Sequence, residues 1–149
     1  MAQSTKVDLN YWHKQVIKDS WNIAKAPSEV REIREIALVA VRKDGLTLEF
    51  CSENLRFDRG VLTEAITQNG EAIQFTSAAL QDDDDLARIA LGNCWQALRF
   101  LSERIRGDPA LMLTEVKYRW WIATYLADSL RYDLDFWFDV LEQDATGGM

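Results

Sequence analysis

The chain repeats itself every 25 residues, and this period constrains its fold more than any other feature of the sequence. Stepping forward by 25 from the segment 41–55 brings similar residues into the same places, without insertion or deletion over four units. One aligned aromatic column consists of Phe50, Phe75, Phe100 and Tyr125. A short unit that recurs in this way cannot bury its apolar face alone and does so by stacking on its neighbours. The period therefore predicts an extended solenoid of stacked units, and the local patterns described below indicate that the units are helical.

A strictly periodic aspartate stands immediately before four successive apolar stretches. The members of this column are Asp58, Asp83, Asp108 and Asp133. Each precedes an apolar stretch, where a carboxylate can accept hydrogen bonds from the unpaired N–H groups of a first helical turn. Asp108 is followed by Pro109, a residue that is well tolerated at the first helical position. The column predicts the N-termini of successive helices.

Each aspartate is followed by an amphipathic stretch of about 10 residues. In one unit its apolar face consists of Val61, Leu62, Ala65 and Ile66. This spacing is helical and not alternating. Glycine follows in two units, and we predict that Gly45 and Gly70 adopt the left-handed conformation that often ends a helix.

A second, shorter helix is predicted over the stretch 46–51 and its counterparts. Leu48, Cys51 and Leu55 follow one another at i, i+3 and i+7, which places them on one helix face. We expect residues 52–58 to turn the chain into the next unit.

Together these patterns predict an all-α fold, a right-stacked α-solenoid of about five 25-residue helix–turn–helix repeats plus a C-terminal capping helix. A single domain is expected over residues 1–143, and residues 144–149 are expected to form a flexible tail. The predicted repeats are approximately 8–33, 34–58, 59–83, 84–108 and 109–133, with the cap helix at 134–143.

The repeat resembles that of a family of bacterial and protist domains known as DUF4116. Units of that family look like an apolar helix ending in Ala-Val, a Lys-Gln-Asn/Asp-Gly turn, Ala-Leu-x-Tyr/Phe-Ala-Ser, and x-x-Leu-x-x-Asp. The matching segments are 39–45, 48–52 and 55–58 in one unit, and 64–70, 72–77 and 80–83 in the next. The resemblance implies a helical-repeat fold and a role as an interaction module, without naming an activity.

The charge balance excludes several classes of partner. The net charge is −7 and the pI about 4.7, whereas nucleic-acid binding relies on Lys and Arg. The same balance argues against an anionic membrane surface and favours a basic protein partner. The sequence has no signal-like N-terminus and no run of 18 apolar residues. We expect a cytoplasmic protein, or one delivered into a host cell without a cleaved signal peptide.

A stack of repeats displays broad surfaces rather than deep pockets, and such surfaces usually bind other macromolecules. We therefore expect a non-enzymatic protein–protein interaction module, either an adaptor or an inhibitor. Direct nucleic-acid binding and membrane binding are not expected. The chain is expected to be a monomer or a homodimer formed through an end helix, with Phe136 and Trp137 as contact residues.

The best candidate for a partner-binding surface is the turn column in which glycine gives way to tryptophan. Trp95 and Trp120 occupy the places of the two glycines, and stacked turns should make them near neighbours. Tyr118, Arg119 and Trp121 flank the second tryptophan. Large rings at exposed turns would form an anchor, since Trp and Tyr carry much of the energy at interfaces. The alternative is that these rings cover the hydrophobic end of the array.

An acidic run is the second candidate. Asp82, Asp84 and Asp85 flank the capping Asp83. They form either a capped and solvated loop or a docking point for a basic partner. Such acidic columns also permit an alternative function, an inhibitor that mimics nucleic acid and blocks a nucleic-acid-binding protein, for example a defence protein. The arginines close by in sequence, which interrupt a single-sign stripe, are Arg56, Arg59, Arg88, Arg104 and Arg106.

An enzyme is not expected, and neither a cofactor nor a metal is predicted. The only histidine is His13, and with Cys51 and Cys94 it supplies too few ligands for a metal site. No phosphate-binding glycine loop and no nucleophile-elbow motif occur. A second alternative remains, a small ligand-binding or hydrolase-like helical protein that uses Cys94 or a pair of carboxylates.

Overall fold

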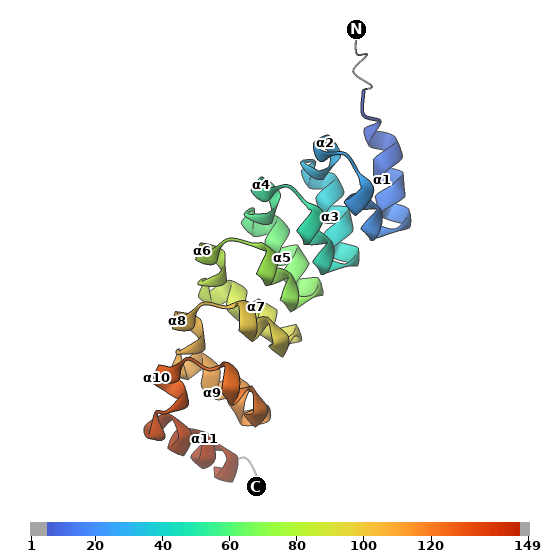
Figure 1. The fold of residues 1–149 in the computed structure, drawn as a ribbon. Coiled ribbons are helices and arrows are strands. Elements are labelled where there is room, and N and C mark those ends of the chain that lie inside the picture. Colours follow the sequence, from blue (N-terminus) through green and yellow to red (C-terminus); the bar gives the residue numbers. More distant parts are fainter. Residues whose placement is uncertain (1–5, 147–149) are drawn as a thin grey trace.

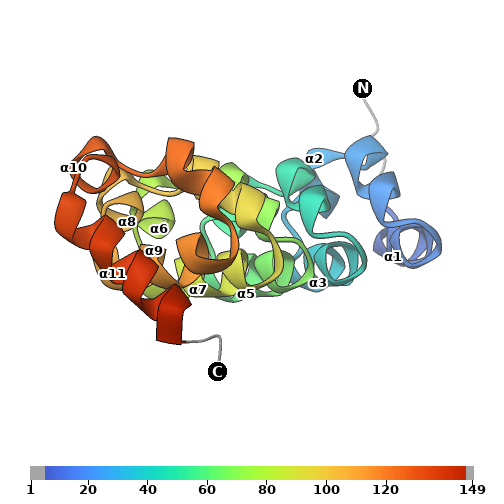
Figure 2. The same ribbon diagram turned by 90° about the horizontal axis from the view of Figure 1, so that it is seen from below.

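The computed structural model describes residues 6–146, and every regular element in that range is a helix. The units stack one after another into an elongated array, with α1 and α11 at its opposite ends (Figures 1 and 2). The predicted all-α solenoid is therefore confirmed.

Each unit contains three helices, namely a long α-helix, a 3₁₀ helix and a short α-helix. The long helices are α1 (Leu9–Lys18), α3 (Arg34–Lys43), α5 (Arg59–Gln68), α7 (Asp84–Asn93), α9 (Pro109–Tyr118) and α11 (Leu134–Thr146). The 3₁₀ helices are η1 (Ser20–Lys25), η2 (Gly45–Phe50), η3 (Gly70–Phe75), η4 (Trp95–Phe100) and η5 (Trp120–Tyr125). The short helices are α2 (Ser28–Arg31), α4 (Glu53–Arg56), α6 (Ala78–Gln81), α8 (Glu103–Arg106) and α10 (Asp128–Arg131). The 25-residue register is kept at every element.

The second half of the unit differs from the predicted helix–turn–helix. The predicted shorter helix is a 3₁₀ helix, and the segment expected to turn the chain contains a short α-helix. The buried residues Gly45, Leu48 and Cys51 recur every third position, which suits a helix of three residues per turn because they then share one edge. The apolar spacing that extends to Leu55 thus belongs to two helices.

The capping column has the predicted role. The Asp58 carboxylate accepts a hydrogen bond from the Val61 N–H at 2.9 Å, and Asp83 accepts one from Leu86 at 3.0 Å. Asp108 does the same for α9, and Asp133 for α11. These bonds satisfy donors that a helix N-terminus would otherwise leave unpaired.

The two turn glycines do not adopt the predicted conformation. No glycine among the described residues has a positive φ. The long helix ends instead at an extended residue whose side chain starts the 3₁₀ helix. Asp44 accepts a hydrogen bond from the Leu46 N–H, and Asn69 accepts one from Glu71, both at 3.0 Å. The side-chain cap, and not the glycine, changes the direction of the chain.

Glycine is required because the next unit comes very close. A Cβ atom on Gly45 would lie 2.2 Å from the Ala65 carbonyl oxygen, and one on Gly70 would lie 2.2 Å from that of Ala90. The Gly70 N–H also donates to the Asn93 side-chain oxygen at 2.7 Å. These contacts allow η2 and η3 to pack directly on the long helix of the following unit, as they do in the structure.

The core runs along the whole stack as periodic columns. One column lies in the last turn of the long helices. Its members Val41, Ile66, Leu91 and Val116 are each at most 1% exposed. Phe50, Phe75 and Phe100 end successive 3₁₀ helices and pack half-buried against the core. The aromatic column therefore lies in successive layers, as the period predicts.

Polar contacts between neighbouring long helices also follow the register. Arg42 pairs with Glu64 at 3.1 Å, and Arg59 pairs with Asp83 at 2.5 Å. Asn93 donates to the carbonyl oxygens of Ile66 and Thr67 at 2.6 and 3.1 Å. Each contact joins two neighbouring units, so together the contacts fix the position of one unit relative to the next.

The C-terminal helix is longer than predicted. Helix α11 continues through Thr146, so residues 144–146 of the predicted tail are helical, while residues 147–149 lie outside the described residues. Within 6–146, no helix combines the length and the apolar character needed to cross a membrane.

Replacing Gly70 with Ala should lower the free energy of unfolding by about 1–3 kcal/mol, because the added methyl group meets backbone atoms that cannot rotate away. Gly92→Ala is the matched control, since a Cβ there meets nothing within 4 Å. In the exposed last turn of α7 it should be neutral or stabilising by up to about 1 kcal/mol. Urea denaturation of both variants checks this, and equal midpoints would contradict the close-contact role of the glycine.

Acid should weaken the fold through its capping carboxylates. The Arg59 guanidinium and the Leu86 N–H hold the pKa of Asp83 below its ordinary value, and the Val61 N–H lowers the pKa of Asp58. A carboxylate whose pKa is lowered by folding stabilises the folded state above its unfolded pKa, about 3.9 for Asp, and this contribution disappears as the pH falls through the folded pKa.

The expected result is a free energy of unfolding that decreases as the pH falls below about 5. Asp83→Asn keeps a good cap but removes the charge, so its decrease with acid should be shallower. Asp83→Ala also removes the cap and should be less stable than Asp83→Asn by about 1 kcal/mol at pH 7. Urea titrations at pH 7 and pH 3 measure both effects. Parallel pH profiles for wild type and Asp83→Asn would refute the role of the charge.

Candidate protein-binding surface

The regular turn is interrupted at the ends of α7 and α9. Cys94-Trp95 and Arg119-Trp120 replace the Asp-Gly and Asn-Gly pairs of the earlier units. Neither Cys94 nor Arg119 forms a side-chain cap, although the Cys94 backbone keeps φ −148° and ψ 101°, close to the values of Asp44. The backbone path is therefore retained at Cys94, whereas Arg119 departs from it, with ψ 60°. At both turns the close packing that glycine permits is lost.

Trp95 lies at the junction between the fourth and fifth units. It is half-buried, packs against the core, and its ring centroid lies 6.0 Å from that of Tyr125. Across the junction, Glu115 stands in the column that holds Ala65 and Ala90 in earlier units. Both sides of the small-residue contact are thus replaced by large side chains. Helices α7 and α9 do not pack as closely as α5 and α7, and Figure 1 shows the wider spacing.

Glu115 and Arg119 form an internal ion pair. The Arg119 Nη1 donates to the Glu115 carboxylate at 2.6 Å, and the Glu115 side chain is only 13% exposed. Desolvation raises the pKa of Glu115, and the positive charge of Arg119 opposes that shift. Arg119, predicted to contact a partner, is therefore engaged within its own helix.

The exposed aromatic residues gather at the next turn. Trp120 is 75% exposed, Tyr118 70% and Trp121 47%. The two indole rings meet edge to face at 6.4 Å, and the Lys117 ammonium lies 5.5 Å from the Tyr118 ring centroid. We call Tyr118, Trp120 and Trp121 the aromatic turn.

The expected pairing of Trp95 with Trp120 is not formed. Among the described residues, the aromatic partner of Trp95 is Tyr125, and that of Trp120 is Trp121. Without glycine, successive 3₁₀ helices η4 and η5 no longer pack together as η3 and η4 do. Trp95 thus covers the core, as the alternative interpretation expected, whereas Trp120 faces solvent.

The acidic run is largely neutralised by arginines. Asp82 accepts hydrogen bonds from the Ser102 hydroxyl and, at 2.9 Å, from Arg104, and these bonds lower the pKa of Asp82. Arg104 also reaches Asp84 at 3.0 Å. Asp85 is the most exposed of the run and lies 3.7 Å from Arg59. The single-sign stripe that a nucleic-acid mimic needs is therefore interrupted by positive charge.

The groups considered for enzymatic chemistry lie in different places. His13 is on α1, Cys51 follows η2, and Cys94 joins α7 to η4. Burial raises the pKa of the Cys51 thiol to about 12, which keeps it protonated. The Cys94 sulfur lies 3.2 Å from the Gln96 side-chain oxygen. No group of three metal-ligating side chains occurs among residues 6–146.

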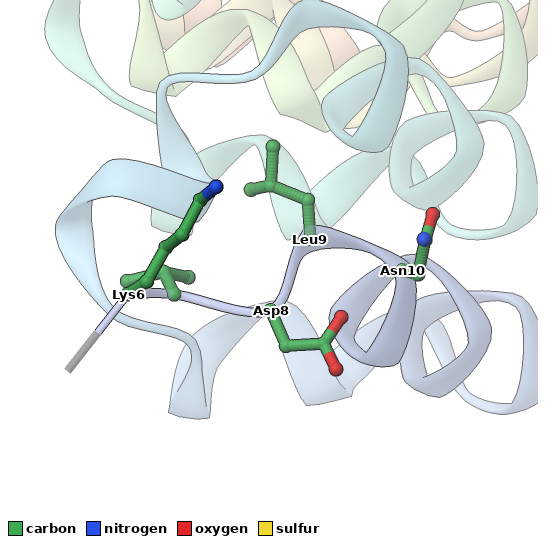
Figure 3. Close-up of a pocket in the computed structure, with 5 residues that line it drawn as sticks. Lys6, Asp8, Leu9 and Asn10 are labelled. Atoms are coloured by element: carbon green, nitrogen blue, oxygen red, sulfur yellow. The ribbon is translucent and has the colours of Figure 1, made fainter.

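A shallow recess lies at the start of α1 (Figure 3). Five consecutive residues, Lys6 to Asn10, line it. Figure 3 shows Lys6 and Leu9 on one side of the chain and Asp8 on the other. The Asp8 carboxylate caps α1 by accepting from the Tyr11 N–H at 3.0 Å. Because one segment supplies every wall, polar groups from different elements do not converge here.

The contact residues expected on the C-terminal helix are misplaced. Phe136 is buried and Trp137 half-buried, because both face α9 and the core. The exposed apolar residues of α11 are instead Leu134, Phe138 and Leu141, at 73%, 62% and 64%. Their spacing of i, i+4 and i+7 was visible in the sequence and could have identified them.

Comparison with known families agrees with the repeat. The model of the Domain of unknown function (DUF4116) matches residues 33–81 and again residues 58–106, one 25-residue step later. No curated protein and no solved structure matches the chain. The protein is thus a DUF4116-type helical repeat protein, with the family's repeats at residues 33–106.

Proposed function

We propose that the protein is a non-enzymatic interaction module that binds a partner protein through the aromatic turn. The observation that carries this proposal is the exposure of Trp120. Its column holds buried glycine in the second and third units and a tryptophan that is 75% exposed in the fifth. Large exposed aromatic side chains gathered on one surface are typical of protein interaction sites.

The backbone of the aromatic turn is held in place by neighbouring residues. The neighbouring Ile122 is fully buried, and Arg119 is tied to Glu115 within α9. The rings therefore stand on a fixed backbone and lose little conformational entropy when a partner covers them, which favours affinity. Tyr and Trp also supply a polar N–H or O–H at the edge of an apolar surface.

The charge of the protein favours a partner with a basic surface. The net charge is −7, and such a field accelerates encounter with a positively charged protein. Because Asp82 and Asp84 already share Arg104, we assign the acidic run to this general field and not to the anchor.

Trp120→Ala should weaken partner binding by about 2 kcal/mol or more, roughly thirtyfold in Kd, and should leave the thermal midpoint unchanged because the ring is mostly exposed. Trp95→Ala should instead lower the thermal midpoint, because that ring packs against the core. Affinity capture from cells of the source organism with quantitative mass spectrometry, followed by calorimetry on the recovered partner, gives the binding readout.

Tyr132→Ala is the matched control for lost aromatic surface, since Tyr132 is 74% exposed and lies outside the aromatic turn. Partners captured by wild type and by Tyr132→Ala, but lost with Trp120→Ala, support the proposal. A set of partners that is the same for all three proteins contradicts it.

A further inference from the structure

The internal junctions of the solenoid show what each unit offers to the next. The Arg34 guanidinium lies 3.7 Å from the Asp58 carboxylate. A Cβ on Gly60 would lie 2.8 Å from the Arg34 guanidinium, so there is little space for a side chain there. Arg42 pairs with Glu64. We call the surface of a long helix that contacts the following unit its outgoing face, and the surface that contacts the preceding unit its incoming face. Helix α1 presents an incoming face, and α11 presents the long-helix part of an outgoing face, without a 3₁₀ helix after it among the described residues.

Each end exposes a residue of a core column. Leu141 belongs to the column of Val41, Ile66, Leu91 and Val116. It is 64% exposed, whereas those four are at most 1% exposed. Tyr11 belongs to the column that includes Val61 and Leu86, and it is 51% exposed, whereas those two are at most 1% exposed. These are the positions that a stacked neighbour covers inside the solenoid.

The outgoing face of α11 is apolar, like that of the internal helix α9. Leu134, Phe138 and Leu141 form an exposed stripe along α11, at the positions that Pro109, Leu113 and Val116 occupy in α9. Such a stripe on a water-soluble helix is typical of a face that packs against another helix.

The two end helices carry opposite charge. Helix α1 contains Lys14 and Lys18 and no acidic residue. Helix α11 contains no basic residue, and its acidic residues are Asp135, Asp139, Glu142 and Asp144. A head-to-tail arrangement therefore places basic against acidic, whereas contacts between two copies of the same end place like charges together.

The repeat register makes this complementarity specific. Position 142 is equivalent to position 42, and position 14 to position 64, so a continued stack would bring Glu142 against Lys14 of the next molecule. This is the place of the Arg42–Glu64 ion pair, with the two signs exchanged. At the junction between α9 and α11, the residues equivalent to Arg42 and Glu64 are Lys117 and Asp139.

A second register contact agrees. The Lys43 ammonium donates to the Ile17 carbonyl oxygen of the preceding unit. The equivalent of Lys43 in α1 is Lys18, and the equivalent of Ile17 in α11 is Glu142. The Glu142 carbonyl oxygen already accepts a hydrogen bond from the Thr146 hydroxyl, because α11 continues through Thr146. Lys18 of an incoming molecule would therefore interact with the acidic side chains of Glu142 and Asp144.

We propose that α11 of one molecule receives α1 of a second copy of this chain, in the register of the internal repeats. The interface is heterologous, because two different surfaces meet, so each bound molecule offers a new open end and assembly continues beyond the dimer. This self-association uses a surface other than the aromatic turn and is independent of the proposed function.

The test is sedimentation equilibrium of the full chain at low ionic strength, because salt screens exposed charge pairs. The weight-average mass should rise with concentration up to about 1 mM without levelling off at a dimer. Leu141→Glu should weaken the association at least tenfold, because it removes the central apolar contact. Its circular dichroism and thermal midpoint should match wild type, since the replaced side chain is exposed.

Charge exchange tests the register itself. Lys14→Glu and Glu142→Lys should each weaken association several-fold, and the double variant should restore it, because the pair is rebuilt with reversed signs. Arg88→Glu and Glu49→Lys, on exposed residues away from the ends, are the matched controls and should associate like wild type.

Three outcomes would overturn the proposal. One is a monomer at every concentration. Another is a mass that levels off at the dimer, which indicates an isologous contact. The last is association that responds no more to Lys14→Glu or Glu142→Lys than to the control variants, which places the contact on another face.

Discussion

The contact between a 3₁₀ helix and the next long helix sets the spacing of the first four units of the array. A Cβ on Gly45 or Gly70 would lie 2.2 Å from the carbonyl oxygen of Ala65 or Ala90. At the first junction the small, buried Ser20 takes the place of the glycine, and Ala40 that of the alanine. Backbone atoms then fix the distance between units more rigidly than side chains could. The ion pairs, side-chain caps and apolar columns repeat because this distance repeats.

The aromatic turn occurs where that contact is abandoned. At the fourth junction, Trp95 and Glu115 replace the small residue on both sides, α7 and α9 no longer pack closely, and Trp95 packs against the core beside Tyr125. One unit later the same column carries Trp120, which faces solvent. A position that breaks a local rule at a cost in packing is a sound place to look for function, since stability alone would keep the glycine.

The sequence was sufficient for whatever depends on periodicity and local chemistry. The 25-residue period located the long helices, and the capping role of Asp58, Asp83 and Asp108 follows from their place before an apolar stretch. The role of the glycines was not predictable, because it depends on a carbonyl group 20 residues away and not on their own φ. The exposure of Trp120 and the burial of Trp95 also depend on which neighbour each ring meets, and identical columns do not encode that difference.

The charges at positions 42 and 64, and at their equivalents 142 and 14, disfavour the insertion of an end helix between two internal units. Arg42 faces Glu64 within the stack, whereas the ends carry Glu142 and Lys14, with the signs reversed. The outgoing end would therefore meet like charge at Glu64, and the incoming end would meet like charge at Arg42. A repeat array is exposed to pairing in the wrong register, because all of its units are alike. Because the signs are reversed at the ends, stacking between molecules brings opposite charges together, whereas insertion between internal units brings like charges together. Specificity therefore arises from repulsion as well as from attraction.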